Sequence, residues 1–288
     1  MDLQEAKLAL GQPSYEDDRV LLYHGDCYSL MDRLPPEIFH LVVTSPPYNI
    51  GKDYETQLSL DEYLNWTRAW IEKVYRLTRS TGAFWLNLGY LSIEGKAKAI
   101  PIPYLIWDRV PFFLMQEIIW NYGAGVAARK FFSPRNEKFL WYVKNENEYT
   151  FNLDEVRDPN VKYPNQKKNG KLRCNTIGKN PSDVWQIAKV TSGENRSSIE
   201  RTPHPAQFPL DLISRVVKAS SNPDDLLLDP FVGSGSLLEA AIRTGRRAIG
   251  FEVRRDYVDV AATRLRHFRK EAQRRAGQAD LFPSSAAE

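Results

Sequence analysis

The chain alternates between short apolar runs and stretches in which apolar residues recur at helical spacing. The apolar runs predict buried β-strands, because runs of about four to eight such residues bounded by turn residues suit a strand covered on both faces. They occupy 19–24, 39–44, 83–88, 117–120, 138–143, 225–228 and 247–251. The helical spacing predicts helices over 29–34, 60–79, 100–110, 208–220, 236–244 and 256–270. Strands alternating with helices predict an α/β protein with a doubly wound, mostly parallel, seven-stranded sheet.

The periodicity is lost between 144 and 200, where Asn, Lys, Pro and Gly accumulate. From Arg157 to Arg201 the chain carries ten Lys or Arg against four Asp or Glu, a local balance of +6 in a chain of net charge +3. Such a segment is typical of an insert that binds a polyanion, and equally of a solvated lysine-rich loop. We therefore divide the chain into a first part at 1–143, an insert at 144–200, a second part at 201–273 and a disordered polar tail at 274–288.

Composition narrows the class of protein. Hydrophobic residues make up 42% of the 288 residues, which suits a packed core rather than a disordered chain. No apolar run reaches the length of a membrane span and the first ten residues lack a secretory signal pattern, so we expect a cytoplasmic protein that does not bind membranes. The two cysteines, Cys27 and Cys174, lack the spacing of metal ligands and are too few for a disulfide framework, and we expect no metal.

A glycine-rich turn follows one of the predicted strands. Residues 229–235, Asp-Pro-Phe-Val-Gly-Ser-Gly, connect the strand at 225–228 to the helix at 236–244. Glycines at such a turn let the backbone approach a nucleotide-like cofactor, which then meets the free N–H groups of the helix N-terminus. Glu252 stands at the end of the next strand, where a carboxylate accepts hydrogen bonds from ribose hydroxyls. Asp229, in place of a phosphate-binding lysine, favours a cofactor with a cationic amino acid end, and S-adenosylmethionine has one.

A second turn, Ser45-Pro46-Pro47-Tyr48, ends the strand at 39–44. Proline donates no hydrogen bond to a strand ladder, so the chain must leave the sheet here. This turn, the 229–235 turn and the segment His204-Pro-Ala-Gln-Phe-Pro209 together resemble the motifs of the DNA amino-methyltransferase family. Members of this family methylate N4 of cytosine or N6 of adenine.

The order of these motifs is also informative. The Ser45–Tyr48 turn precedes the insert and the glycine-rich turn comes last, which resembles the β group of the family. The resemblance implies the fold of S-adenosylmethionine-dependent methyltransferases in a circularly permuted form. In that form the strand at 19–24 lies beside the strand that ends at Glu252, and the segment 144–200 is the target-recognition insert.

The resemblance assigns roles to individual positions. Catalysis falls to Ser45, Pro46, Pro47 and Tyr48. Cofactor binding falls to Asp26, Cys27, Ala206, Gln207, Phe208, Asp229, Phe231, Gly233, Ser234, Gly235, Glu252 and Val253. Of these, Asp26 would either face the adenine of the cofactor or cap the helix that follows it, or do both. The insert would bind double-stranded DNA, with Arg173, Lys179 and Arg196 as candidate contacts.

The residue types at the Ser45–Tyr48 turn suit methylation of an amine. The exocyclic nitrogen of a base is a poor nucleophile because its lone pair is conjugated with the ring, and acceptors aimed at its N–H groups favour a more tetrahedral nitrogen. The Ser45 hydroxyl and the Pro46 carbonyl are the candidate acceptors, and Tyr48 would stack on a base flipped out of the duplex. Methylation at C5 of cytosine needs a nucleophilic cysteine at this turn, and none follows the prolines.

The first residue of the turn bears on the target base. In most of the family, serine accompanies N4-cytosine methylation and aspartate accompanies N6-adenine methylation. We therefore expect a site-specific cytosine-N4 DNA methyltransferase of a restriction–modification system, with N6-adenine methylation as the alternative. A homodimer and a cognate restriction endonuclease acting on the same site are further partners that the resemblance suggests.

Two other classes of function stay open. One is a non-catalytic nucleic-acid binder on the same scaffold, which the intact turn and both cofactor acids disfavour. The other is methylation of RNA or of a protein glutamine, and the related glutamine enzymes carry asparagine where this chain has Ser45.

Overall fold

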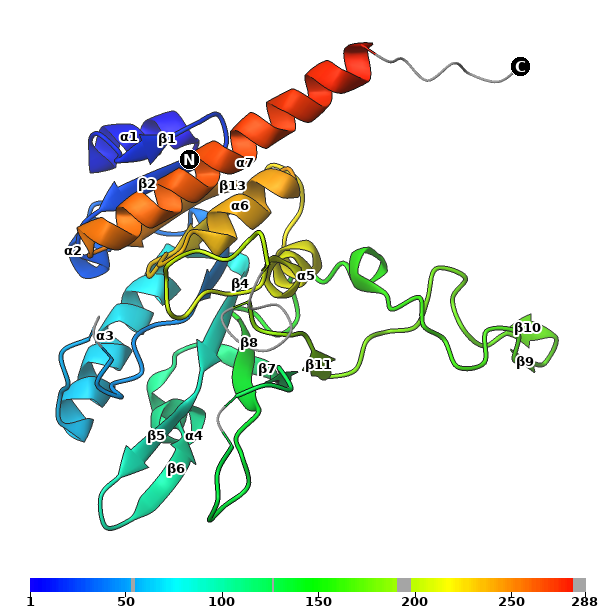
Figure 1. Cartoon of the computed structure of the whole chain (residues 1–288), viewed down its shortest axis with the longest axis horizontal. Coiled ribbons are helices and arrows are strands. Elements are labelled where there is room, and N and C mark those ends of the chain that lie inside the picture. The colour runs from blue at the N-terminus through cyan, green and yellow to red at the C-terminus, as the bar shows by residue number, and fades with distance from the viewer. Residues whose placement is uncertain (53–54, 126, 191–197, 282–288) are drawn as a thin grey trace.

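A nine-stranded sheet forms the centre of the computed structural model, which describes residues 1–288 except 53–54, 126, 191–197 and 282–288 (Figure 1). The strand order is β1-β2-β13-β12-β3-β4-β8-β7-β11. All seven predicted strands are present, as β2 (Val20–His24), β3 (Phe39–Thr44), β4 (Thr78–Leu88), β7 (Phe113–Asn121), β8 (Asn136–Val143), β12 (Leu226–Asp229) and β13 (Arg247–Glu252). Two short strands that were not predicted, β1 (Tyr15–Glu16) and β11 (Val184–Gln186), extend the two edges.

The direction of the strands confirms the permuted arrangement. The five strands β2, β13, β12, β3 and β4 are parallel, and β8 is antiparallel to both β4 and β7. The first of the predicted strands, β2, pairs with the last, β13, so that His24 lies opposite Glu252. The carboxyl ends of both strands therefore meet at the same edge of the sheet.

Helices cover both faces of the sheet, which makes it doubly wound as predicted. One face packs against α1 (Leu3–Leu10), α2 (Cys27–Asp32), α3 (Leu60–Leu77) and α4 (Ile102–Ile106), and the other against α5 (Leu210–Ser220), α6 (Ser236–Arg243) and α7 (Arg255–Leu281). Alternate side chains of each strand supply the two cores: in β4, Phe84 and Leu86 belong to the first and Trp85 to the second. Among the helices of the described residues, none combines the length and the apolarity required to cross a lipid bilayer.

Three segments differ from the predictions. Helix α1, which opens with a capping box between Asp2 and Glu5, was not predicted. The helix predicted at 100–110 is shorter, because the hairpin of β5 (Tyr90–Ile93) and β6 (Ala97–Pro101) takes up its start and leaves α4 and the 3-10 helix η1 (Trp107–Arg109). The tail predicted to be disordered from 274 is helical to Leu281, since its Ala, Gln and Arg residues favour continuation of α7, and 282–288 lies outside the described residues.

The predicted insert leaves the body of the molecule as an arm (Figure 1). In the part of it between 144 and 183, regular structure is limited to the 3-10 helix η2 (Leu153–Val156) and the strands β9 (Lys167–Lys168) and β10 (Lys171–Leu172), which pair with each other. The chain then returns to the body, where β11 pairs with β7 and places Trp185 opposite Trp120. Residues 184–186 of the predicted insert are therefore part of the central sheet.

Candidate active site

The carboxyl ends of β3 and β12 open a cavity. These neighbouring parallel strands are followed by helices on opposite faces of the sheet, α3 after β3 and α6 after β12, so that their connections diverge. Ligands of doubly wound sheets bind in the crevice left by such a divergence. A cavity of 290 Å³ lies at this point, lined by residues that follow β2, β3, β12 and β13.

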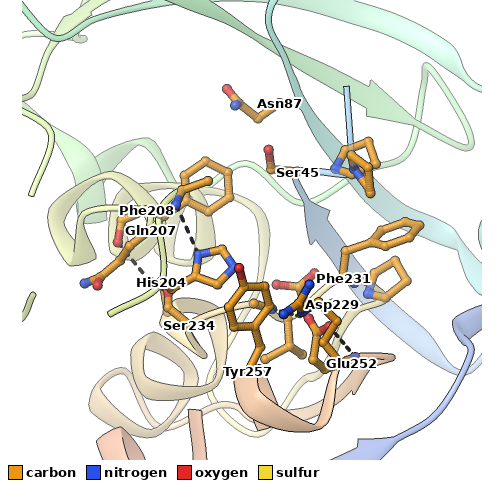
Figure 2. Close-up of a pocket in the computed structure, with 18 of the residues that line it drawn as sticks. Ser45, Asn87, His204, Gln207, Phe208, Asp229, Phe231, Ser234, Glu252 and Tyr257 are labelled. Atoms are coloured by element: carbon orange, nitrogen blue, oxygen red, sulfur yellow. Dashed lines mark hydrogen bonds between the residues drawn. The ribbon is translucent and has the colours of Figure 1, made fainter. Parts of the chain in front are cut away.

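The cavity brings together the two turns singled out in the sequence. It is lined by Ser45, Pro46, Pro47 and Tyr48, and by the predicted cofactor positions Asp26, Cys27, Ala206, Gln207, Phe208, Asp229, Phe231, Gly233, Ser234, Glu252 and Val253. Figure 2 shows Ser45 and Asn87 at one end, with Asp229 and Glu252 at the other. The Ser45–Tyr48 turn and the glycine-rich turn therefore share one cleft.

One predicted cofactor residue, Gly235, does not line the cavity. Its backbone is left-handed, with φ of 79°, and it begins α6. A Cβ at this position would lie 3.1 Å from the Cβ of Ala261, so the glycine permits close packing between α6 and α7. Gly235 therefore supports the turn from the side of α7, and its contact with the cofactor stays a prediction.

Glu252 holds the glycine-rich turn against the end of β13. Its Oε2 accepts a hydrogen bond from the Gly233 N–H at 2.9 Å, and its Oε1 accepts one from the Arg254 N–H at 2.9 Å. Burial raises the pKa of Glu252, and these backbone donors oppose the rise. Gly233 itself has φ of 52°, and a Cβ there would lie 2.8 Å from Nε2 of His204, so the turn requires glycine.

Asp229 connects the two turns. The Thr44 hydroxyl at the end of β3 donates to Oδ1 of Asp229 at 2.7 Å, and the Phe231 N–H donates to the same oxygen at 3.0 Å. Burial raises the pKa of Asp229 to about 7, and the nearby Glu252 carboxylate adds to the rise. A buried carboxylate of this kind is stabilised by a cationic ligand. This end of the cavity therefore fits the ammonium group at the amino acid end of S-adenosylmethionine.

Asp26 caps a helix and lines the cavity, so both of its predicted roles are sterically compatible. Its carboxylate accepts hydrogen bonds from the N–H of Ser29 at 3.2 Å and from the hydroxyl of the same residue at 3.0 Å. The neighbouring Cys27 is buried, and burial raises the pKa of its thiol to about 12. Cys27 therefore contributes an unreactive apolar wall at neutral pH.

The segment 204–208 forms another wall. The Gln207 side chain is engaged within its own loop, accepting from the Thr202 N–H at 2.8 Å and donating to the Glu200 carbonyl at 2.6 Å. Phe208 stacks on Phe139 of β8, with ring centroids 5.7 Å apart. His204, to which the sequence assigned no chemistry, is buried, and burial lowers its pKa to about 4, so this residue is a neutral wall at physiological pH.

Sequence reasoning missed a polar cluster at the end of the cavity that holds the Ser45–Tyr48 turn. Asn87 of β4, Glu137 of β8 and Lys189 after β11 all line the cavity. Asn87 Nδ2 lies 2.7 Å from Oε2 of Glu137, and Lys189 Nζ lies 2.6 Å from Oε1 of the same residue. The one local signal was Asn87, a polar residue within the apolar run Ala-Phe-Trp-Leu-Asn-Leu, because polar groups in a buried strand need partners.

Two of the predicted DNA contacts, Arg173 and Lys179, do not line the cavity. Arg173 follows β10 on the arm and donates to Oε1 of Gln166 at 3.2 Å. Lys179 forms an ion pair with Asp158 at 3.0 Å, so its charge is partly compensated. Arg196 lies outside the described residues.

A doubly wound sheet whose crevice joins the Ser45–Tyr48 turn to an acidic glycine-rich turn is typical of an α/β methyltransferase. The family model of DNA methylases matches residues 39–263. The type II methyltransferase M.ScaI of Streptomyces caespitosus is 60% identical over 263 residues, which cover 91% of this chain and 86% of that protein. The DNA adenine methyltransferase YhdJ of Escherichia coli (strain K12) is 29% identical over 85% of this chain and 82% of its own length.

A solved structure agrees on the fold. The PvuII DNA methyltransferase, described as cytosine-N4-specific, superposes with a TM-score of 0.70 over 88% of this chain and 89% of its own, at 23% identity. The chain belongs to the family of DNA methylases that act on N4 of cytosine or N6 of adenine. This membership confirms the predicted family, its fold and its methyl donor, S-adenosylmethionine.

Proposed function

We propose that this DNA methyltransferase methylates N4 of cytosine at a specific site in duplex DNA, with N6 of adenine as the alternative target. The observation that carries the proposal is the shared cavity, in which Ser45 directly follows β3 and Asp229 ends the neighbouring strand β12. The Thr44–Asp229 hydrogen bond joins the two strand ends. Two carboxylates at one end suit the cofactor, and a hydroxyl beside a carbonyl at the other end suits an amine. A non-catalytic binder would not need the two ends to share one cleft.

Each group of the chain has a role that follows from its chemistry. S-adenosylmethionine, when bound, supplies an electrophilic methyl group. Asp229 would pair with its ammonium group, and Glu252 with its ribose hydroxyls. At the other end, the Ser45 hydroxyl and the Pro46 carbonyl would accept the N–H groups of the target amine and favour a tetrahedral nitrogen. The rigid prolines hold these acceptors in place before the base arrives.

The preference for cytosine rests on the serine of the turn. Ser45 stands where members of the family that methylate adenine usually carry aspartate, and its hydroxyl is a neutral acceptor. Tyr48 would stack on the flipped base, and Trp66 and Trp120 line the same cavity as further aromatic walls.

The arm is the proposed DNA-reading element. Its β9–β10 hairpin presents exposed Lys167, Lys168 and Lys171, and Arg173 follows directly. These charges would neutralise phosphates and set the register from which bases are read. Lys179 and Arg196 stay predicted contacts, and a homodimer and a cognate endonuclease stay predicted partners.

Transfer of an isotope-labelled methyl group to DNA tests the proposal. Purified protein is incubated with labelled S-adenosylmethionine and duplex DNA, and the digested nucleosides are analysed by mass spectrometry for N4-methylcytosine and N6-methyladenine. Ser45→Ala should lower the rate by about 10²-fold, the usual cost of one preorganised polar group at a reacting centre. Ser92→Ala, on the exposed β5–β6 hairpin, is the matched control and should retain the wild-type rate.

Each outcome of this assay is informative. Label found only in N6-methyladenine would replace cytosine by the alternative target. DNA binding without any methyl transfer would support the non-catalytic binder instead. Transfer to RNA or protein in preference to DNA would overturn the proposed substrate, and wild-type activity of Ser45→Ala would overturn the role of the turn.

A further inference from the structure

A chain of hydrogen bonds runs from the Ser45–Tyr48 turn to the half-buried ion pair of Glu137 and Lys189. The Ser45 hydroxyl lies 2.9 Å from the Tyr48 hydroxyl, which lies 3.2 Å from Oε2 of Glu137. Asn87 Nδ2 also donates to the Tyr48 hydroxyl, at 2.6 Å, and Lys189 Nζ lies 2.6 Å from Oε1 of Glu137. All five residues line the cavity that holds the reacting groups in the proposed function.

The strongest acceptor in this chain favours one direction for its hydrogen bonds. Besides Ser45, the phenol proton of Tyr48 has two acceptors, Oε2 of Glu137 at 3.2 Å and the backbone carbonyl oxygen of Asn87 at 3.3 Å. The charged carboxylate is the stronger acceptor, so it draws the proton toward Glu137. With its proton directed to Glu137, the Tyr48 oxygen is an acceptor for the Asn87 side-chain amide and the Ser45 hydroxyl. The Ser45 proton therefore points to Tyr48 and away from the target amine. The lone pairs of Ser45 are left for the N–H group of the amine.

The surroundings keep this arrangement in place. Burial raises the pKa of Tyr48 well above its usual value, and the Glu137 carboxylate adds to the rise, so the phenol keeps its proton at neutral pH. A Cβ at Gly89 would lie 2.9 Å from Cε2 of Tyr48, so the absence of that atom allows the ring to lie close against the backbone. Lys189 compensates the charge of Glu137 and lies 3.8 Å from the centroid of the Tyr122 ring.

We propose that Glu137 is a positioning residue that acts through Tyr48 to make Ser45 a hydrogen-bond acceptor toward the target amine. A serine hydroxyl can donate or accept, and a donor at this point would repel the N–H group that it has to hold. The Glu137 carboxylate favours the accepting orientation of Ser45 through two successive hydrogen bonds, from Tyr48 to Glu137 and from Ser45 to Tyr48. The inference rests on the proposed function, because it concerns how the same turn holds the amine.

The test is a double-mutant cycle on the single-turnover rate of methyl transfer, measured at saturating DNA and cofactor. Glu137→Gln keeps the shape of the side chain, but its amide can donate to the Tyr48 oxygen and so reverse the chain. It should lower the rate by about 10-fold or more while the dissociation constants of DNA and S-adenosylmethionine change less than about 2-fold. Tyr48→Phe keeps the ring and breaks the chain, so adding Glu137→Gln to it should change the rate by less than about 2-fold further.

Glu117→Gln is the matched control. Glu117 also pairs with a lysine across β7 and β8, at 3.6 Å from Nζ of Lys138, but it does not line the cavity. Glu117→Gln should retain the wild-type rate. A rate loss in Glu137→Gln would then be due to the Glu137 carboxylate and not to the loss of an ion pair between β7 and β8. Thermal unfolding of each variant checks that the fold is intact, and Tyr48→Phe gives a second route to the answer should Glu137→Gln fold poorly.

The outcomes separate this inference from the proposed function. An active wild type with an equally active Glu137→Gln variant would overturn the role of Glu137 alone. Rate losses that multiply in the double variant would also overturn it, because residues acting through one chain do not add independently. A loss confined to DNA or cofactor affinity would show a binding role instead. A wild type that transfers no methyl group to DNA would remove the proposed function and this inference together.

Discussion

Asp229 offers a sharp test because its carboxylate should oppose folding while it serves cofactor binding. Asp229→Asn preserves the shape of the side chain and retains an oxygen for the Thr44 hydroxyl and the Phe231 N–H, which both donate to Oδ1. It removes only the buried charge. The variant should therefore be more stable than the wild type in the absence of cofactor and should bind S-adenosylmethionine more weakly.

The size of the effect follows from the pKa. Burial raises the pKa of Asp229 from 3.8 to about 7 in the folded state. A folded-state pKa above the unfolded one means that stability is lost as pH rises from 3.8 through about 7. At about 1.4 kcal/mol per pKa unit, the loss amounts to about 4 kcal/mol at pH 8 and at most about 2 kcal/mol at pH 5. The gain in stability from Asp229→Asn should therefore grow between pH 3.8 and about pH 7 and stay level above pH 7.

Urea unfolding at pH 5 and pH 8 without cofactor measures the gain, and isothermal titration calorimetry with S-adenosylmethionine measures the loss of affinity. Asp108→Asn is the control, because the Asp108 side chain is 79% exposed and its charge is largely solvated. The control should shift stability by less than about 0.5 kcal/mol at either pH. A variant of Asp229 that is less stable than the wild type at pH 8, or whose gain is the same at both pH values, would refute the reasoning.

Two further predictions concern the arm and the thiols. Replacing the three lysines of the β9–β10 hairpin, Lys167, Lys168 and Lys171, by glutamine should weaken DNA binding and reduce the slope of log affinity against log salt by up to about 3, as fluorescence anisotropy at several salt concentrations would show. An unchanged slope would place the phosphate contacts elsewhere. Iodoacetamide should modify the half-buried Cys174 and spare Cys27, whose pKa burial raises to about 12, as peptide mass spectrometry would show. Faster labelling of Cys27 would contradict the closed wall described for this residue.

Much of the site was predictable because turn chemistry is local. Two consecutive prolines after an apolar run end a strand wherever it lies in the sheet, and glycines with left-handed backbone mark the turn at Gly233. Parallel strands bring their carboxyl ends to one edge of the sheet, and both turns directly follow parallel strands. The strands β2, β3, β12 and β13 were also predictable from local sequence, because each is a largely apolar run that the sheet buries on both faces.

The sequence by itself thus determined the family, the seven central strands and the two turns that line the cavity. Only the tertiary structure decided which polar side chains support them. Glu137 contacts Tyr48 because β8 pairs with β4 in a register that places Phe139 opposite Asn87. Lys189 lies close enough to pair with Glu137 because β11 pairs with β7. Strand register depends on packing across the whole sheet, and these partners are separated by 89 and 52 residues along the chain, so no local pattern could reveal them.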